Sequence, residues 1–123
     1  MSLVLVVEDD KDIRETISLV LEDSGYDVVT APHGKEALRL LRAGLRPNVM
    51  ILDLMMPVMS GWELREQMLR DPQIASIRTI VITGDTKSSR CAESLGAVAR
   101  LAKPFEPDDL LALLDAAEPD RSR

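Results

Sequence analysis

The stretch VMILDLMMP, residues 49–57, decides the fold that this chain of 123 residues is expected to adopt. Its first half, Val49 to Leu52, is apolar, too short for a separate helix, and flanked by segments with helical periodicity. A run of this kind is typical of a strand buried on both faces of a parallel sheet. Open α/β sheets bind their ligands outside the carboxyl ends of the strands. We therefore expect Asp53, which ends the run, to lie at a strand tip that faces a crevice.

Three other apolar runs also lead into residues that can be charged or that carry a hydroxyl group. They are residues 3–7 before Glu8, Asp9 and Asp10, residues 79–82 before Thr83, and residues 98–102 before Lys103. Because parallel strands place their carboxyl ends on one edge of a sheet, these side chains are expected to share a pocket with Asp53. The sequence thus predicts a cluster of carboxylates with one hydroxyl group and one ammonium group.

Segments with helical signals separate the strands along the chain. The first predicted helix begins at the acidic residues Asp9–Asp12, the second contains Ala37–Leu41, and the third begins at a capping box formed by Ser60 and Glu63. The fourth runs from Ser88 or Ser89 to Leu95, and the fifth begins at Pro107. A fifth strand is predicted over residues 26–30. This alternation predicts an α/β fold, a doubly wound sheet of five parallel strands with helices on both faces.

Four residues outside the strand ends receive structural interpretations. His33 is expected in a surface turn, Trp62 near the surface, and Cys91 in helix packing. Leu69 is a candidate for the buried face of the third helix, together with Leu64 and Met68.

The composition argues against several classes of protein. A net charge of −6 at pH 7 is unfavourable for a general nucleic-acid binder, which would need a basic patch. The chain has neither a long apolar run nor a basic segment before its first strand, so no membrane span or signal peptide is expected. A single cysteine favours a reducing compartment, and a cytoplasmic location is the expectation. Residues 1–118 are expected to form one domain, followed by a polar tail, 119–123, without an output domain.

The predicted acidic cluster is suited to a hard cation. Glu8, Asp9 and Asp53 would bring about three negative charges into one cleft, and carboxylates that close raise each other's pKa unless a cation joins them. Mg²⁺ takes oxygen ligands and uses few carboxylates, so it is the expected partner. The alternative is that Glu8, Asp9 and Asp10 only cap the first helix, but Asp53 at a second strand end favours a site.

The chain resembles the receiver domains of bacterial two-component response regulators, of the chemotaxis-regulator type. The matching pieces are VLVVEDD at 4–10, ILDLMMP at 51–57 with Gly61, ITG at 82–84 and KPF at 103–105. Together they span nearly the whole chain in the right order and at the right spacing. The resemblance implies a flavodoxin-like sheet with the strand order 2-1-3-4-5.

The resemblance also implies a role for each strand-end residue. Asp53 would be the phosphoacceptor, with Thr83 and Lys103 in contact with the phosphoryl oxygens. Mg²⁺ would be held by Asp9 directly, by Glu8 through water, by Asp53 and by the backbone carbonyl of Met55. The Lys103–Pro104 peptide bond is cis in the family.

Two further positions bear on the expected switch. Asp85 lies in the loop over the cleft, where the family tunes the loss of the phosphoryl group. Arg100 stands where the family usually has an aromatic residue or histidine. Because burying an unpaired guanidinium would be very costly, we expect Arg100 to stay near solvent and to pair with a carboxylate such as Asp85.

The resemblance implies partners as well. The phosphodonor would be a sensor histidine kinase or a phosphotransfer protein, and a downstream protein would read the face formed by the fourth helix, the fifth strand and the fifth helix. No direct contact with nucleic acid or membrane is expected, and the oligomeric state is left open. The chain is expected to be no enzyme in its own right, although it would assist its own phosphorylation and dephosphorylation.

Two other functions compete with this interpretation. One is a degenerate receiver that docks onto a partner without being phosphorylated. The other is an aspartyl-phosphate phosphohydrolase, which also uses a strand-end aspartate and Mg²⁺. Those enzymes usually carry a second aspartate two residues after the nucleophile, and here that position is Met55.

Overall fold

The computed structural model describes residues 2–54, 56, 59–84 and 96–117. Within these residues the strands are β1 (Leu3–Val7), β2 (Asp27–Ala31), β3 (Val49–Asp53), β4 (Arg78–Thr83) and β5 (Ala99–Ala102). The helices of the same residues are α1 (Lys11–Asp23), α2 (Gly34–Arg42), α3 (Gly61–Leu69) and α5 (Pro107–Ala117). The predictions for Met55, Asp85, Cys91, the helix of residues 88–95 and the tail of residues 119–123 lie outside the described residues.

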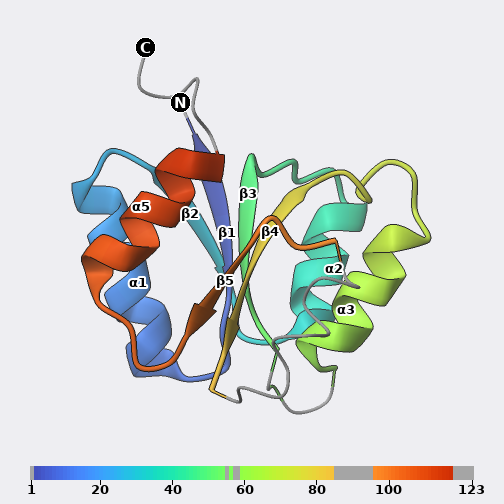
Figure 1. Cartoon of the computed structure of the whole chain (residues 1–123). Helices are drawn as coiled ribbons and strands as arrows, with labels where there is room; N and C mark the ends of the chain where they lie inside the picture. Colours follow the sequence, from blue (N-terminus) through green and yellow to red (C-terminus); the bar gives the residue numbers. More distant parts are fainter. Residues whose placement is uncertain (1, 55, 57–58, 85–95, 118–123) are drawn as a thin grey trace.

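The five strands form one parallel sheet in the order β2-β1-β3-β4-β5. Helices α1 and α5 cover one face of the sheet, and α2 and α3 cover the other (Figure 1). This arrangement confirms the predicted fold class and strand order. Strand β3 lies at the centre with all five of its residues buried, as its unbroken apolar run predicted.

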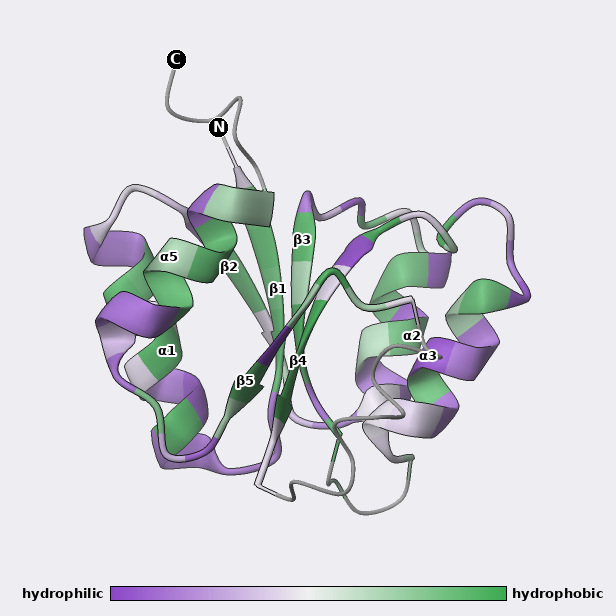
Figure 2. Ribbon diagram, in the orientation of Figure 1, coloured by the Kyte–Doolittle hydropathy of each residue, from purple (hydrophilic) through white to green (hydrophobic). Residues whose placement is uncertain are grey.

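Successive residues of the central strands feed two separate cores. On β1, Val4 and Val6 pack in the core under α1 and α5, whereas Leu5 and Val7 pack in the core under α2 and α3. This alternation follows from the two-residue period of a strand. Strands β1 and β3 are therefore hydrophobic along their length (Figure 2), and the first polar residues come at their carboxyl ends.

Side-chain caps begin three of the helices. Asp10 caps α1 by accepting from the amides of Asp12 at 2.9 Å and Ile13 at 3.2 Å. The predicted capping box of Ser60 and Glu63 starts α3 and is confirmed. His33 differs from the surface turn expected for it. It is half-buried, and its Nδ1 accepts from the amide of Glu36 at 3.2 Å, so it caps α2.

Two strand starts and the burial of one helical residue differ from the prediction. The amide of Tyr26 closes α1 by donating to the Leu21 carbonyl at 3.0 Å, so the second strand begins at Asp27 rather than Tyr26. Strand β5 begins at Ala99, after a half-exposed Val98. Leu69 is 44% exposed because it follows the buried Met68 directly and lies about 100° further around the helix.

Glycine at position 61 lets α3 start directly against the end of β3. A Cβ atom there would lie 2.5 Å from the Asp53 carbonyl oxygen and 2.7 Å from the Leu54 Cα, both of them backbone atoms. The Gly61 amide also donates to the Leu54 carbonyl at 3.2 Å. The backbone behind Asp53 is therefore held in a contact that a larger residue would disturb.

Candidate functional site at the carboxyl edge of the sheet

The predicted site residues come from the same edge of the sheet. Asp53 is the last residue of β3 and Thr83 the last of β4, while Glu8 and Lys103 directly follow β1 and β5. Glu8, Asp53 and Thr83 are each exposed by 2% or less. Polar groups are thus buried at the points where the apolar strands end.

Three carboxylates meet at this edge. One oxygen each of Glu8, Asp9 and Asp53 lies within 4.8 Å of the others. Glu8 and Asp53 are buried, whereas Asp9 is exposed, so the cluster has an inner side and an open side. The Asp10 amide donates to Glu8 Oε1 at 3.3 Å, which links the inner carboxylate to the start of α1.

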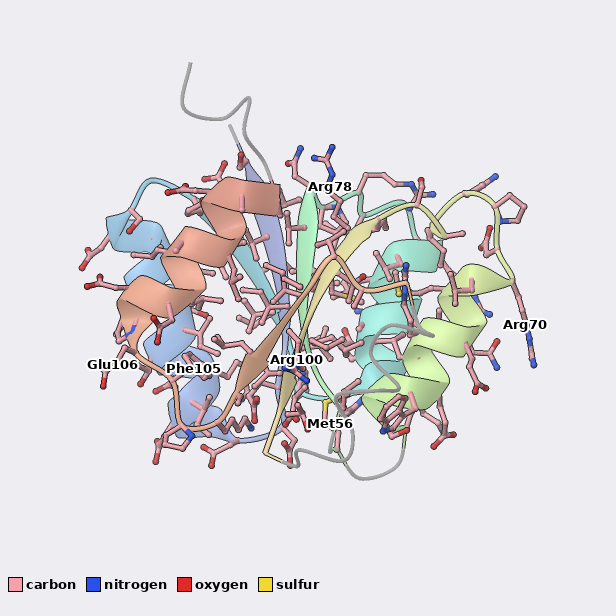
Figure 3. All side chains as sticks on the ribbon, viewed as in Figure 1. Met56, Arg70, Arg78, Arg100, Phe105 and Glu106 are labelled. Atoms are coloured by element: carbon pink, nitrogen blue, oxygen red, sulfur yellow. The ribbon has the colours of Figure 1, made fainter. Side chains whose placement is uncertain are left out.

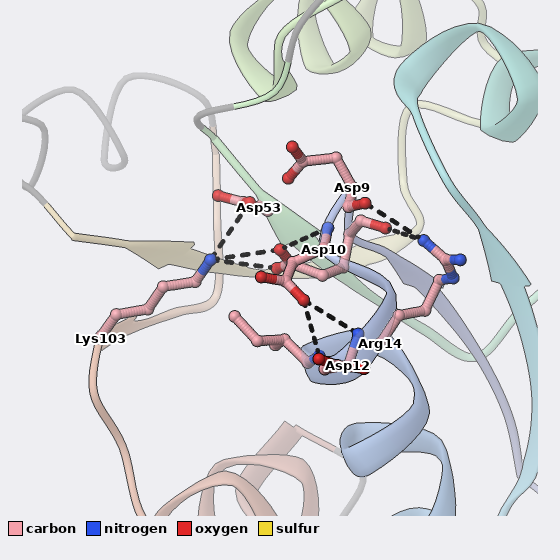
Figure 4. A network of polar contacts seen from close by, with 8 residues as sticks. Asp9, Asp10, Asp12, Arg14, Asp53 and Lys103 are labelled. Carbon is pink, nitrogen blue, oxygen red and sulfur yellow. Dashed lines mark hydrogen bonds and ion pairs between the residues drawn. The ribbon is translucent and has the colours of Figure 1, made fainter.

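Lys103 approaches the cluster from the side of β5 (Figure 4). Its Nζ lies 3.2 Å from Asp53 Oδ2, 3.2 Å from Glu8 Oε2 and 3.3 Å from Glu8 Oε1. Burial lowers the pKa of Lys103, but attraction to Asp53 and Glu8 outweighs it, and the pKa is raised above its ordinary value. Lys103 therefore acts as a fixed cation that bridges the two buried acids.

Glu8 is the perturbed acid of the cluster. Burial raises the pKa of Glu8, and the charge of Asp53 raises it further, while Lys103 lowers it. The net result is a pKa of about 7, against an ordinary value of 4.5. One lysine is thus not enough to keep both buried carboxylates fully ionised at neutral pH.

The donor set fits Mg²⁺. All three candidate ligands are carboxylates, the hard oxygen ligands that Mg²⁺ prefers. Among the described residues, Glu8 Oε2 is a buried oxygen that accepts no hydrogen bond, although it forms an ion pair with Lys103. Three carboxylates facing a single ammonium group leave a deficit of about two positive charges, which is the charge of one Mg²⁺ ion.

The raised pKa of Glu8 makes the expected Mg²⁺ affinity depend on pH. A proton on Glu8 competes with the ion, so the affinity should fall as the pH falls through about 7. We expect binding about tenfold weaker at about pH 6 than at about pH 8, measured by titration calorimetry. In Glu8→Gln the change over the same range should shrink to less than about twofold. An equally steep dependence in that variant would assign the proton to another group.

The remaining predicted residues lie around the cluster. The Lys103–Pro104 peptide bond is cis. The Lys103 amide donates to the Thr83 carbonyl at 2.9 Å, which joins the ends of β4 and β5. Arg100 is exposed on β5 (Figure 3), as its charge predicted, while its expected partner Asp85 lies outside the described residues. Trp62 is half-buried and packs against Leu54 and Val81, which agrees with the position near the surface expected for it.

Two arginines with structural roles, Arg14 beside the site and Arg65 away from it, had no signal in the sequence. Arg14 Nη1 donates to the Glu8 carbonyl at 2.8 Å, so α1 reaches back to the end of β1. Arg65 on α3 is 4% exposed, and its Nη2 donates to the Ala75 carbonyl at 3.3 Å. Burial lowers the pKa of Arg65. Helical periodicity places such residues on a face, but it does not say where a long side chain ends.

A parallel five-stranded sheet with clustered carboxylates and a lysine at its carboxyl edge defines a doubly wound α/β protein with a candidate ligand site at the strand ends. The family model of the response regulator receiver domain matches residues 4–115, and the chain belongs to this family. The resemblance inferred from the sequence motifs is thereby confirmed.

Curated and solved relatives agree with this assignment. Response regulator SaeR of Staphylococcus epidermidis is 39% identical over 113 residues, which is 90% of this chain and 48% of that protein. Chemotaxis protein CheY4 of Vibrio cholerae superposes with a TM-score of 0.88 at 35% identity, over 95% of this chain and 98% of that one. TrrA of Thermotoga maritima, solved in complex with Mg²⁺ and BeF, superposes with a TM-score of 0.84 at 29% identity, over 95% and 99% of the two chains.

The chain spans about half the length of SaeR. No helix among the described residues has the length and apolar character needed to cross a membrane.

Proposed function

We propose that this chain is the phosphoacceptor of a two-component phosphorelay, and that Asp53 receives the phosphoryl group in a Mg²⁺-dependent transfer. The proposal is carried by one observation: the buried carboxylate of Asp53 shares a cluster with Glu8 and Asp9 and contacts the ammonium group of Lys103. Phosphoryl transfer requires positioning and charge neutralisation more than covalent chemistry from the protein, and these groups supply both.

The transfer is an in-line displacement at phosphorus. A carboxylate oxygen of Asp53 forms the new O–P bond, and the P–N bond to the donor histidine breaks. The electron pair of that bond stays on the imidazole nitrogen, which takes up a proton. The donor class is a sensor histidine kinase or a phosphotransfer protein.

The charge change at Asp53 explains the neighbouring cations. Conversion of a carboxylate to an acyl phosphate takes the local charge from about −1 to about −2. Lys103, which already contacts Asp53, would move its ion pair to the new phosphoryl oxygens. Glu8, Asp9 and Asp53 would hold Mg²⁺, which when bound supplies further neutralisation of the phosphoryl charge.

The output is a change in the surface that a downstream protein reads. The Thr83 hydroxyl would donate a hydrogen bond to the phosphoryl group, and this new bond would change the contacts at the end of β4. Arg100 on β5 is exposed, so its side chain can take part in this surface without burial of the guanidinium. The face would include β5, α5 and the segment that precedes β5.

Labelling with acetyl phosphate tests the proposal. The chain should incorporate phosphate when Mg²⁺ is present and lose most of that incorporation when a chelator removes the ion. A chain that takes up no phosphate with Mg²⁺ present would instead be a docking module. Sustained turnover of small phosphate esters would identify a phosphohydrolase, and we expect none because Met55 stands where such enzymes carry their second aspartate.

A further inference from the structure

Arg14 contacts the acidic turn from the side opposite Lys103. It lies in the second turn of α1 and is half-buried. Its Nη1 donates to the Glu8 carbonyl at 2.8 Å and makes a longer contact of 3.5 Å with the Asp9 carbonyl. Figure 4 shows Arg14 and Lys103 on opposite sides of the turn that carries the two acids.

The two cations differ in the atoms that they bind. Lys103 contacts the carboxylates of Glu8 and Asp53, two of the side chains that would hold a metal ion. Among the described residues, the hydrogen bonds of the Arg14 guanidinium go to backbone carbonyls. Arg14 therefore holds the main chain of the turn, and the side chains of Glu8 and Asp9 stay available to a ligand.

Other hydrogen bonds hold the two ends of the turn, and Arg14 holds the backbone between them. The Glu8 amide donates to the Ala31 carbonyl at 3.2 Å, which ties the start of the turn to β2. Asp10 begins α1 as its cap, which ties down the end of the turn. Between these points the Glu8 and Asp9 carbonyls are held by Arg14, and a charged donor makes such hydrogen bonds about twice as strong as a neutral one.

We infer that Arg14 is a positioning residue for the Mg²⁺ site, because it fixes the backbone that aims Glu8 and Asp9 at the ion. The inference rests on the Mg²⁺ binding of the proposed function. Groups that orient metal ligands without touching the ion typically change metal affinity by about 10- to 100-fold when they are removed. The effect should appear in the affinity itself, before any phosphoryl chemistry takes place.

The test compares Mg²⁺ dissociation constants by titration calorimetry in the full chain. Arg14→Met keeps an unbranched side chain of similar length but donates no hydrogen bond, and it should weaken Mg²⁺ binding by about tenfold. Arg14→Lys keeps a charged donor that can reach one carbonyl, and it should recover at least half of that loss on a logarithmic scale.

Arg46 offers a matched control. Its Nη1 donates to the Leu41 carbonyl at 2.7 Å and the Leu45 carbonyl at 2.8 Å, the same kind of contact at the opposite end of the sheet. Arg46→Met should lower the thermal unfolding midpoint about as much as Arg14→Met does, while its Mg²⁺ affinity stays within about twofold of wild type.

The outcomes separate this inference from the proposed function. Wild-type Mg²⁺ affinity in Arg14→Met would overturn the positioning role alone. Equal weakening in Arg14→Met and Arg46→Met would also overturn it, because a general loss of stability would then explain both. Failure of the wild-type chain to bind Mg²⁺ would overturn the proposed function, and this inference with it. If Arg14→Met does not fold, the Arg14→Lys chain provides the test, since a donor with shorter reach should still weaken Mg²⁺ binding about two- to threefold.

Discussion

Asp53→Asn should incorporate no phosphate from acetyl phosphate in the presence of Mg²⁺, under conditions that label the wild-type chain. An amide oxygen carries no charge and is too weak a nucleophile to attack phosphorus. The substitution keeps the shape of a side chain that is 2% exposed, so the loss should come from chemistry and not from unfolding. Phosphate incorporation measured by intact-protein mass spectrometry reports the result.

The stability of Asp53→Asn follows from the charges around Glu8. The charge of Asp53 raises the pKa of Glu8, so its removal should bring that pKa down. Lys103 keeps Glu8 as a partner at 3.2 Å. The substitution removes both the repulsion between Asp53 and Glu8 and the attraction between Asp53 and Lys103. Because these two changes oppose each other, we expect the free energy of unfolding to change by less than about 1 kcal/mol.

Asp10→Asn is the matched control for the acceptor. It makes the same chemical change at another acid of this edge, where Asn caps a helix as well as Asp does. The Asp10→Asn chain should be labelled like wild type. Labelling of Asp53→Asn at the wild-type rate would move the acceptor to another acid, with Asp9 the first alternative because it shares the cluster.

The fold was predictable where local signals and burial agreed. The apolar run of β3 is buried at every position, and the capping box at Ser60 begins α3 where the motif placed it. The boundary at Tyr26 was not predictable from its aromatic character. Its amide closes the preceding helix, and its hydroxyl donates to Asp115 at 3.2 Å, a partner 89 positions away in the chain. Strand propensity carries no information about contacts of that kind.

The position of the acids and the lysine at one edge could be predicted from the sequence, because a parallel sheet aligns the carboxyl ends of its strands. The protonation state of the cluster could not be predicted. Glu8 has a pKa of about 7 only because it is 1% exposed and faces Asp53, and both conditions depend on the completed fold. The contact from Arg14 to the Glu8 carbonyl was equally hidden, since it depends on the angle between β1 and α1.

Lys103→Met should alter three measurable quantities, and not all in the same direction. At a pH where Glu8 is ionised in both chains, Mg²⁺ affinity should rise by roughly tenfold, because the ammonium group that contacts the Glu8 and Asp53 oxygens no longer repels the ion. Labelling of Asp53 should slow by about 10²-fold, because a donor aimed at the developing phosphoryl charge is lost. The metal-free chain should lose about 1–3 kcal/mol of stability, because Glu8 and Asp53 are left without their common cation.

The stability loss in Lys103→Met should also depend on pH. Without Lys103 the pKa of Glu8 rises above about 7, so the folded variant keeps a proton on Glu8 that the unfolded chain has released. Stability then falls more steeply with rising pH than in wild type, and the difference between the two chains should be larger at about pH 8 than at about pH 6. Chemical denaturation without Mg²⁺ at both pH values measures it.

Lys11→Met is the matched control for Lys103→Met. Lys11 also pairs with a carboxylate, Glu15 at 3.9 Å, but the two side chains are 74% and 61% exposed. Solvent screens a pair of this kind, so the same substitution should leave Mg²⁺ affinity and labelling unchanged. A Lys103→Met chain that binds Mg²⁺ no more tightly than Lys11→Met would show that the ammonium group does not compete with the ion. The carboxylate oxygens that it contacts would then not be the oxygens that hold Mg²⁺.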